Sequence, residues 1–262
     1  MNTTSNTSSE HCVWVSAGVL NNKLCDRNFD CEHCPLDAAL RDDVSACSEN
    51  GASLSVTTMQ FPDWEQLSED VQRVLSPLRS IPLCKDARYS ARHAWVRLLP
   101  SGLMRIGLDA FAAAMLPEDA QLITVAHNTV LREGEALGWV YAWNKTLPLP
   151  APVSGVVTCR GNDYLRTVKE LRRNPYRDGS LLTLTPAVGA IATARVYPAA
   201  THRKRIERHC RKLTGRILRA LALPEAGLCL NDGGVPVASL PDMFGDDRYW
   251  GILKHFIGGP GH

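Results

Sequence analysis

Two short apolar runs, Trp95-Val-Arg-Leu-Leu99 and Leu103-Met-Arg-Ile-Gly-Leu108, flank the turn signal Pro100-Ser-Gly102. Similar runs follow them along the chain, and stretches containing glycine or proline separate these runs, which lie at residues 121–125, 136–140, 155–159 and 181–184. Short strands at this regular spacing predict a small β-sandwich or barrel. The alanine-rich stretch 109–116 interrupts them and predicts a helical turn.

Five sequence landmarks stand in order over residues 89 to 187. They are Tyr89-Ser-Ala-Arg-His-Ala-Trp-Val96, Ile106-Gly-Leu-Asp-Ala-Phe111, Gly134-Glu-Ala-Leu-Gly-Trp-Val140, Ala151-Pro-Val-Ser-Gly155 and Asn174-Pro-Tyr-Arg-Asp-Gly179. In this order they resemble the H-protein of the glycine cleavage system, although Ala94 stands where that family has a glutamate. The ordered set is specific, whereas no single landmark would suffice.

The resemblance implies a fold and a type of activity. The fold is a lipoyl-type sandwich or barrel, so the whole chain is expected to be α+β, with a cysteine-rich segment before this domain and helices after it. In the family, a hairpin presents a lysine to which a ligase attaches lipoic acid. The lipoyl arm carries an aminomethyl group and electrons between enzymes, while the domain itself catalyses nothing.

The attachment position is occupied by Asn144 when the family register is counted from both sides. In the family the lysine lies six residues after the glycine that corresponds to Gly138, and seven before the alanine that corresponds to Ala151. Both counts reach Asn144, whose amide cannot be acylated as an amine is. The hypothesis that follows is a module that keeps the fold and has lost the carrier role.

Lys145 is an alternative attachment site. A shifted turn would place this lysine at the hairpin tip and preserve lipoylation, which would make the chain a working lipoyl carrier in one-carbon or sulfur metabolism. One residue moves a side chain to the opposite face of a strand, so the two registers are distinct hypotheses. Trp139, Tyr141 and Trp143 alternate nearby and predict packing on one strand face.

Four cysteines crowd the N-terminal part of the chain, at Cys12, Cys25, Cys31 and Cys34. In a reducing compartment, clustered cysteines favour metal or redox chemistry over disulfides. Four thiolates suit a closed tetrahedral zinc site or an iron–sulfur cluster. Reduced structural cysteines, or a redox-active dithiol at Cys31 and Cys34, are the alternatives.

The 262 residues carry a formal charge of +2, and 45% of them are hydrophobic, which is typical of a globular protein. No apolar run approaches the length of a transmembrane helix, and the polar start lacks the features of a signal peptide. We therefore expect a cytoplasmic location. Residues 1–10 are expected to be disordered.

Helices are expected on both sides of the strand-rich domain. Residues 62–78 have apolar residues at helical spacing and follow a predicted linker at 48–60. A basic helix follows Pro198, with Thr201 as its cap and an apolar stripe, and another short helix spans 246–257. The basic helix contains eight Lys or Arg between residues 203 and 219. We interpret these charges as a solvent-exposed helix face in preference to a nucleic-acid binding site, because no DNA-binding fold surrounds them.

The sequence thus predicts five regions: 1–10, the cysteine-rich segment 11–47, a linker and helix at 48–85, the H-protein-like domain at 86–187, and a helical extension at 188–262. No serine–histidine–aspartate set, phosphate loop or paired carboxylates indicates an enzyme. We expect a non-catalytic accessory protein that contacts other proteins, such as redox or one-carbon enzymes. Lipoate belongs to the alternative hypothesis.

Overall fold

The computed structural model describes residues 25, 28–33, 54–160, 168–222 and 239–258. The chain divides into two compact units, Met1–Gly51 and Ala52–His262. The disorder expected at 1–10 lies outside the described residues. All the elements that follow belong to the second unit.

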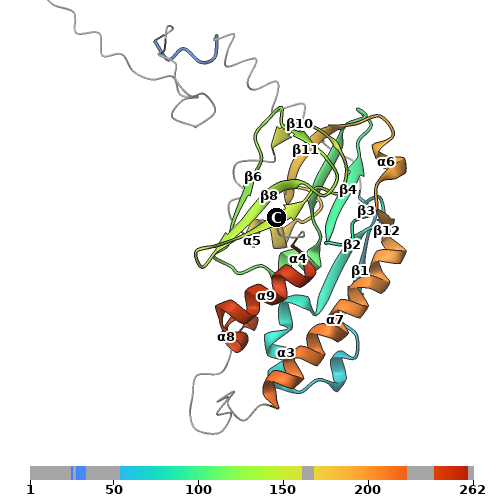
Figure 1. The fold of residues 1–262 in the computed structure, drawn as a ribbon, viewed down its shortest axis with the longest axis vertical. Coiled ribbons are helices and arrows are strands. Elements are labelled where there is room, and N and C mark those ends of the chain that lie inside the picture. Colours follow the sequence, from blue (N-terminus) through green and yellow to red (C-terminus); the bar gives the residue numbers. More distant parts are fainter. Residues whose placement is uncertain (1–24, 26–27, 34–53, 161–167, 223–238, 259–262) are drawn as a thin grey trace, which may run out of the picture. The chain divides into compact units, whose positions relative to one another are not determined.

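Two antiparallel sheets form the centre of this unit (Figure 1). The larger sheet has the strand order β12 (Tyr197–Pro198), β3 (Arg88–Tyr89), β4 (Ala94–Leu98), β5 (Met104–Leu108), β11 (Ser180–Pro186), β10 (Gly155–Arg160) and β7 (Val130–Leu131). The smaller sheet has the order β6 (Gln121–Thr124), β8 (Ala136–Ala142) and β9 (Lys145–Pro150). The expected strand-rich sandwich is therefore confirmed.

One continuous hydrophobic core joins the two sheets and the helices. Trp95 on β4 is fully buried, and its indole N–H donates to the carbonyls of Leu108 and Pro175. Gly107 lies opposite Trp95, and a Cβ there would come within 2.7 Å of the indole. The glycine in the Ile-Gly-Leu run is thus needed because the tryptophan ring covers it.

Strand β9 had not been expected, because its sequence contains Pro148 and Pro150. Proline cannot donate a ladder hydrogen bond and is confined to strand edges. In the structure β9 is an edge strand of the three-stranded sheet and, among the described strands, pairs with β8 alone. The prolines are therefore tolerated where one side of the strand needs no donor.

The region before the H-protein-like domain differs from the expectation. Residues 56–60, expected as linker, form β1 (Val56–Gln60), which pairs with β2 (Ser80–Cys84). Its Val-Thr-Thr run is β-branched and favours a strand although it is small and polar. The expected helix at 62–78 is divided into η1 (Trp64–Gln66), α3 (Glu69–Val74) and η2 (Ser76–Leu78).

Two residues explain why that helix is not continuous. Leu67 has an extended backbone, so the chain leaves η1 and restarts at α3, whose N-cap is Ser68. Pro77 lies in η2 and lacks the N–H that a helix interior requires.

Short helices complete the sandwich. They are α4 (Ala110–Met115), α5 (Val168–Arg173) and α6 (Ala190–Thr193). The helical turn expected at 109–116 is confirmed by α4, which Asp109 caps by accepting a hydrogen bond from the Ala112 N–H at 2.8 Å.

The long basic helix α7 spans Ala199–Leu221 and contacts β2 and β3 (Figure 1). Its N-cap is Pro198, so the assignment of Thr201 as cap was wrong; Pro198 is extended, and the helix has already begun at Ala199. The expected apolar stripe is buried at Ile206, Cys210, Leu213 and Ile217. The last residue of that stripe, Leu221, is half-buried.

Two further helices follow, α8 (Leu240–Phe244) and α9 (Asp246–Phe256), and α9 matches the helix expected at 246–257. None of the described helices combines the length and apolar character needed to cross a membrane.

Candidate functional site

The hairpin between β8 and β9 presents Asn144 at its tip. Ala142 pairs with Lys145, so only Trp143 and Asn144 form the turn. Both have positive φ angles, 50° and 56°, as a type I′ hairpin turn requires. Asparagine tolerates this conformation far better than most residues. Asn144 therefore closes the hairpin in the left-handed conformation.

The Asn144 side chain is exposed and locally held. Its Oδ1 accepts a hydrogen bond from the Tyr141 hydroxyl at 3.0 Å. This contact spans three residues and joins the turn to the end of β8. The side chain at the tip is therefore a neutral amide with a local structural partner.

Lys145 begins β9 and points toward α9. Its Nζ donates to Oδ1 of Asp247 at 2.5 Å, and 31% of its side chain is exposed. The hydrogen bond and the charge of Lys145 lower the pKa of Asp247. The amine is thus engaged with the first turn of α9, although Asp247 itself is almost fully exposed.

Trp143 also contacts α9. Its ring packs edge-on against Tyr249 and Trp250, with ring centroids 6.2 Å apart in both cases. Trp143 therefore packs across the turn rather than on the strand face shared by Trp139 and Tyr141. The C-terminal helix covers one side of the hairpin tip and leaves Asn144 in solvent.

The cysteine set is described only in part. Cys25 and Cys31 are half-buried, whereas Cys12 and Cys34 lie outside the described residues. The Phe29 N–H donates to Sγ of Cys25 at 3.2 Å. His33 is exposed and pairs with Asp30 at 3.0 Å.

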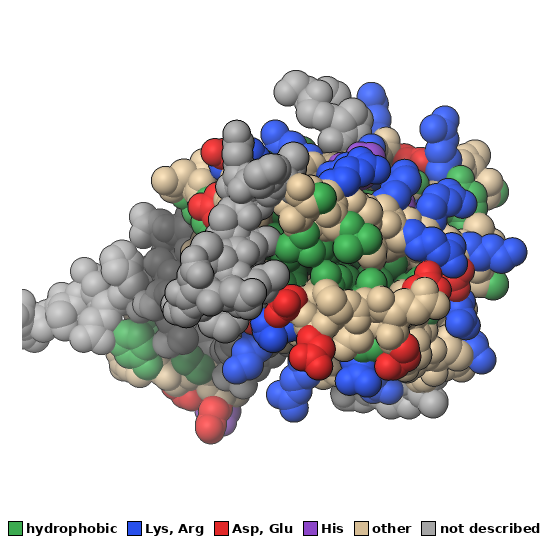
Figure 2. Space-filling model, turned by 90° about the horizontal axis from the view of Figure 1, so that it is seen from below, with side chains coloured by type: hydrophobic (Ala, Val, Ile, Leu, Met, Phe, Trp, Pro, Cys, Tyr) green, Lys and Arg blue, Asp and Glu red, His purple; other side chains and the backbone are tan. Residues whose placement is uncertain are grey.

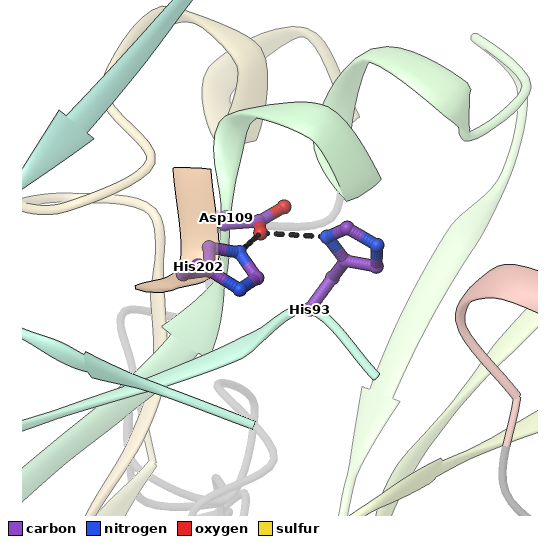
Figure 3. A group of neighbouring side chains, drawn as sticks. All are labelled: His93, Asp109 and His202. Carbon is purple, nitrogen blue, oxygen red and sulfur yellow. Dashed lines mark hydrogen bonds and ion pairs between the residues drawn. The ribbon is translucent and has the colours of Figure 1, made fainter. Parts of the chain in front are cut away.

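A second polar site lies beneath α7 and is fully buried (Figure 3). Asp109, the N-cap of α4, places its Oδ2 between two imidazoles. Nδ1 of His93 lies 2.8 Å from this oxygen, and Nε2 of His202 lies 2.5 Å from it. The two histidines come from the loop before β4 and from α7, so the site joins α7 to the sandwich.

Aromatic packing fixes both rings. His202 stacks on Tyr89, with centroids 4.3 Å apart, and His93 stacks on Phe111 at 4.6 Å. His93 has a φ of 64°, a conformation that a non-glycine residue adopts only when its surroundings hold it there. The backbone is therefore bent to point the His93 ring at Asp109.

His209 extends this network toward the surface. Its Nδ1 shares a hydrogen bond of 2.8 Å with Nε2 of His93, and His209 is half-buried. Because His202 and His209 are seven residues apart, they lie on the same face of α7. We call His93, Asp109, His202 and His209 the histidine–aspartate network.

Burial and mutual charge set the protonation of the network. Burial would raise the pKa of Asp109, but His93 and His202 outweigh it and lower that pKa. Burial lowers the pKa of His202, and Asp109 opposes this only in part. Burial, then repulsion from His93 and Lys212, lowers the pKa of His209 to about 3. Asp109 is therefore ionised, and both imidazoles beside it donate.

His93, Asp109 and His202 also offer a ligand set of a kind that zinc accepts, with three donor atoms within 4.8 Å of one another. Ligands that share one zinc at bonds of about 2.0–2.1 Å lie about 3.4 Å apart in a tetrahedron. The separations of 2.8 and 2.5 Å are those of hydrogen bonds. The geometry therefore fits a proton-linked network better than a metal centre.

The sequence had not indicated this network. Its members are separated by up to 116 residues, and Asp109 was assigned only to the start of a helical turn. One signal was available, because His202 lies four residues before Ile206 and extends the buried stripe of α7 by one turn.

Comparison with known proteins places this domain in a family. The family model described as "Glycine cleavage H-protein" matches residues 87–201. The glycine cleavage system H protein of Chlorobium phaeobacteroides (strain BS1) is 30% identical over 116 residues, covering 43% of this chain and 91% of that protein. That of Mycobacterium leprae (strain TN) is 31% identical over 121 residues, covering 45% and 92%. A crystal structure of a glycine cleavage system H protein from Mycobacterium marinum covers 47% of this chain and 98% of that chain, at 22% identity and a TM-score of 0.40. With this much of the curated relatives matched at 30% identity, the chain belongs to the glycine cleavage H-protein family.

Proposed function

We propose that the chain is a non-catalytic H-protein module in which Asn144 occupies the lipoyl attachment position. It acts as an interaction or redox-linked accessory protein, and its partners are other proteins, of the redox or one-carbon kind. The observation that carries the proposal is the exposed Asn144 at the tip of a two-residue turn.

The chemistry of attachment supports this reading. Lipoylation needs a nucleophilic amine in solvent at the tip of the hairpin, and an amide is not such a nucleophile. The neighbouring amine of Lys145 is ion-paired with Asp247 and starts a strand rather than the turn.

A working carrier modified on Lys145 is the second candidate function. The exposure of Asp247 favours it, because ion pairs with a solvated partner are weak and open readily. Lipoate would then be the cofactor, and the hairpin would present Lys145 to the ligase after the ion pair breaks.

Expression with a functional lipoylation system separates the two candidates. We expect the intact mass of the full chain to equal that calculated from its sequence, with no lipoyl adduct. The matched variant Lys145→Gln identifies the site if an adduct is found. An adduct on the wild-type chain that Lys145→Gln abolishes would replace the first candidate by the second.

The cysteine-rich segment adds a metal site to this proposal. Cys12, Cys25, Cys31 and Cys34 would hold one zinc ion or an iron–sulfur cluster. Of these four, Cys25 and Cys31 lie in the described part of the chain, six residues apart in sequence. So short a segment orders more readily with a metal, because metal binding and folding are then one equilibrium.

Elemental analysis and visible absorption of anaerobically purified protein test this part. We expect either colourless protein with one zinc, or coloured protein with iron and sulfide. The variant Cys25→Ser/Cys31→Ser should lose the metal, whereas Cys84→Ser, which changes a buried cysteine of the other unit, should keep it. Metal-free wild-type protein would refute the site and leave the Asn144 proposal untouched.

A further inference from the structure

A group of cationic and imidazole side chains surrounds Phe256, near the C-terminal end of α9. His209 and His255 lie with their ring centroids 4.9 and 5.1 Å from that of Phe256. The Arg216 guanidinium lies 5.7 Å from the same ring centroid. Three groups from two different helices thus meet over one aromatic side chain.

Two more cations complete this group. Arg92, from the loop before β4, donates to the His255 carbonyl at 2.7 Å. Lys212 is exposed on α7, three residues after His209 and four before Arg216, so the three share one helix face. We call Arg92, His209, Lys212, Arg216 and His255 the cationic cluster.

In the described part of the chain, no carboxylate forms an ion pair with the three cations Arg92, Lys212 and Arg216. The exposed ion pairs of α7 involve Arg203 with Glu207 and Arg211 with Asp63, outside the cluster. Burial, followed by the charges of Arg216, Lys212 and Arg92, lowers the pKa of His255, and no anion offsets them. In Figure 2, Lys and Arg side chains gather on one side of the visible face, with a histidine side chain and some Asp and Glu side chains near them.

The C-terminal end of α9 explains the position of only one of these three cations, Arg92. Cations at a helix C-terminus are favourable, and Arg92 already donates to a carbonyl there. Lys212 and Arg216 come from α7, and like charges held together repel one another. Two guanidinium groups and one ammonium group supply charged donors of the kind that bind an acceptor with several oxygens.

We propose that the cationic cluster is a binding site for a phosphate group, either as free phosphate or as part of a small phosphorylated ligand. Three cations match a dianion better than a carboxylate in charge, and the planar guanidinium groups match its oxygens in geometry. His209 also forms a hydrogen bond with His93, so a ligand bound at the cationic cluster would lie next to the histidine–aspartate network. The site does not involve Asn144 or Lys145, and its test is independent of lipoylation.

Inorganic phosphate titrated into the full chain at constant ionic strength is the direct test, with calorimetry as the readout and with acetate and chloride as comparison anions. The test variant is Lys212→Gln/Arg216→Gln. The matched control is Lys204→Gln/Arg208→Gln, which removes the same charge from exposed positions of the same helix. We expect the test variant to weaken phosphate binding at least about tenfold, and the control at most about twofold.

In this titration, two outcomes would overturn the site. One is equal weakening by both variants, which means a response to net charge alone, and the other is phosphate binding no tighter than acetate binding.

If the test variant fails to fold, an experiment on the wild-type chain still tests the site. Phosphate should then shift the imidazole proton signals of His209 and His255 in nuclear magnetic resonance spectra. The signal of exposed His127, on a loop of the sandwich, should stay in place. Unmoved His209 and His255 signals would refute the proposal. Titration with a phosphorylated sugar or nucleotide then separates a free-phosphate site from a larger ligand site.

Discussion

The hairpin tip and the histidine–aspartate network are both polar sites that contact the C-terminal helices, but they are built in opposite ways. The tip is formed by Trp143 and Asn144, neighbours in sequence, and Asn144 is exposed. In the network, His93, Asp109 and His202 are fully buried and come from distant parts of the chain. Substitutions of Asn144 should therefore change chemistry at little cost in stability, whereas substitutions in the network should destabilise the protein strongly.

The largest effect is expected for Asp109→Ala. The variant removes the acceptor of two buried imidazoles and the cap of α4, and breaking a buried charged network costs about 3–5 kcal/mol. Urea unfolding followed by circular dichroism measures the loss. Asp109→Asn keeps an oxygen for the Ala112 N–H and should retain part of the stability. A loss below about 1 kcal/mol for Asp109→Ala would mean that the network does not hold α7.

A pH-dependent effect comes next. In the unfolded chain histidine titrates near about 6.5. In the folded protein the pKa of His209 is about 3 and that of His202 is lowered. Between these pKa values the unfolded state binds more protons, so stability falls as pH decreases through this window.

The slope of stability against pH, measured from about pH 7 to about pH 4.5, checks this sign. His209→Gln should flatten the slope, because glutamine does not titrate. The exposed variant His127→Gln, which removes a histidine from a loop of the same unit, is the control. Stability that rises on acidification would show that the imidazoles are protonated in the folded state.

A smaller loss is expected for Trp143→Ala. The ring is half-buried between the turn and α9, so its removal should cost about 1–2 kcal/mol, less than for a fully buried tryptophan. Hydrogen exchange of α9 should increase with this loss. An unchanged exchange pattern would show that α9 is held without the hairpin.

The smallest effect is expected for Asp247→Asn. Its side chain is almost fully exposed, so the midpoint of unfolding should not change measurably. The Lys145 amine should react faster with an acetylating reagent, since it loses its partner. Lys169 is exposed on another helix and supplies the control rate. A clear fall in the unfolding midpoint would mean that the ion pair fastens α9 to the hairpin.

The tip could be predicted from sequence because its determinants are local. The tolerance of asparagine for positive φ followed from its residue type, whereas the assignment of Asn144 as the attachment position stays a prediction. The strands of the sandwich could be predicted for the same reason, from short apolar runs between turn signals.

The histidine–aspartate network could not be predicted because nothing local distinguishes it. His93 stands inside a family landmark, and His202 stands in a basic helix where the charges draw attention to the solvent face. His202 reaches Asp109 only after α7 folds back onto β3, whereas His93 lies beside Asp109 because β4 pairs with β5. Strand β1 was missed for a different reason, since its β-branched run was interpreted as a small, polar linker before its pairing with β2 was known. The helix expected at 62–78 is divided at Ser68 and Pro77.

The register of the hairpin is tested most directly by a lipoylation assay of wild-type chain and Asn144→Lys with the same ligase, followed by peptide mapping. We expect no lipoyl group on the wild-type chain. Asn144→Lys should fold with a loss of at most about 1 kcal/mol and supply a modifiable amine at the tip. A wild-type peptide lipoylated at Lys145 would contradict the assignment of Asn144 as the attachment position and make the chain a working carrier.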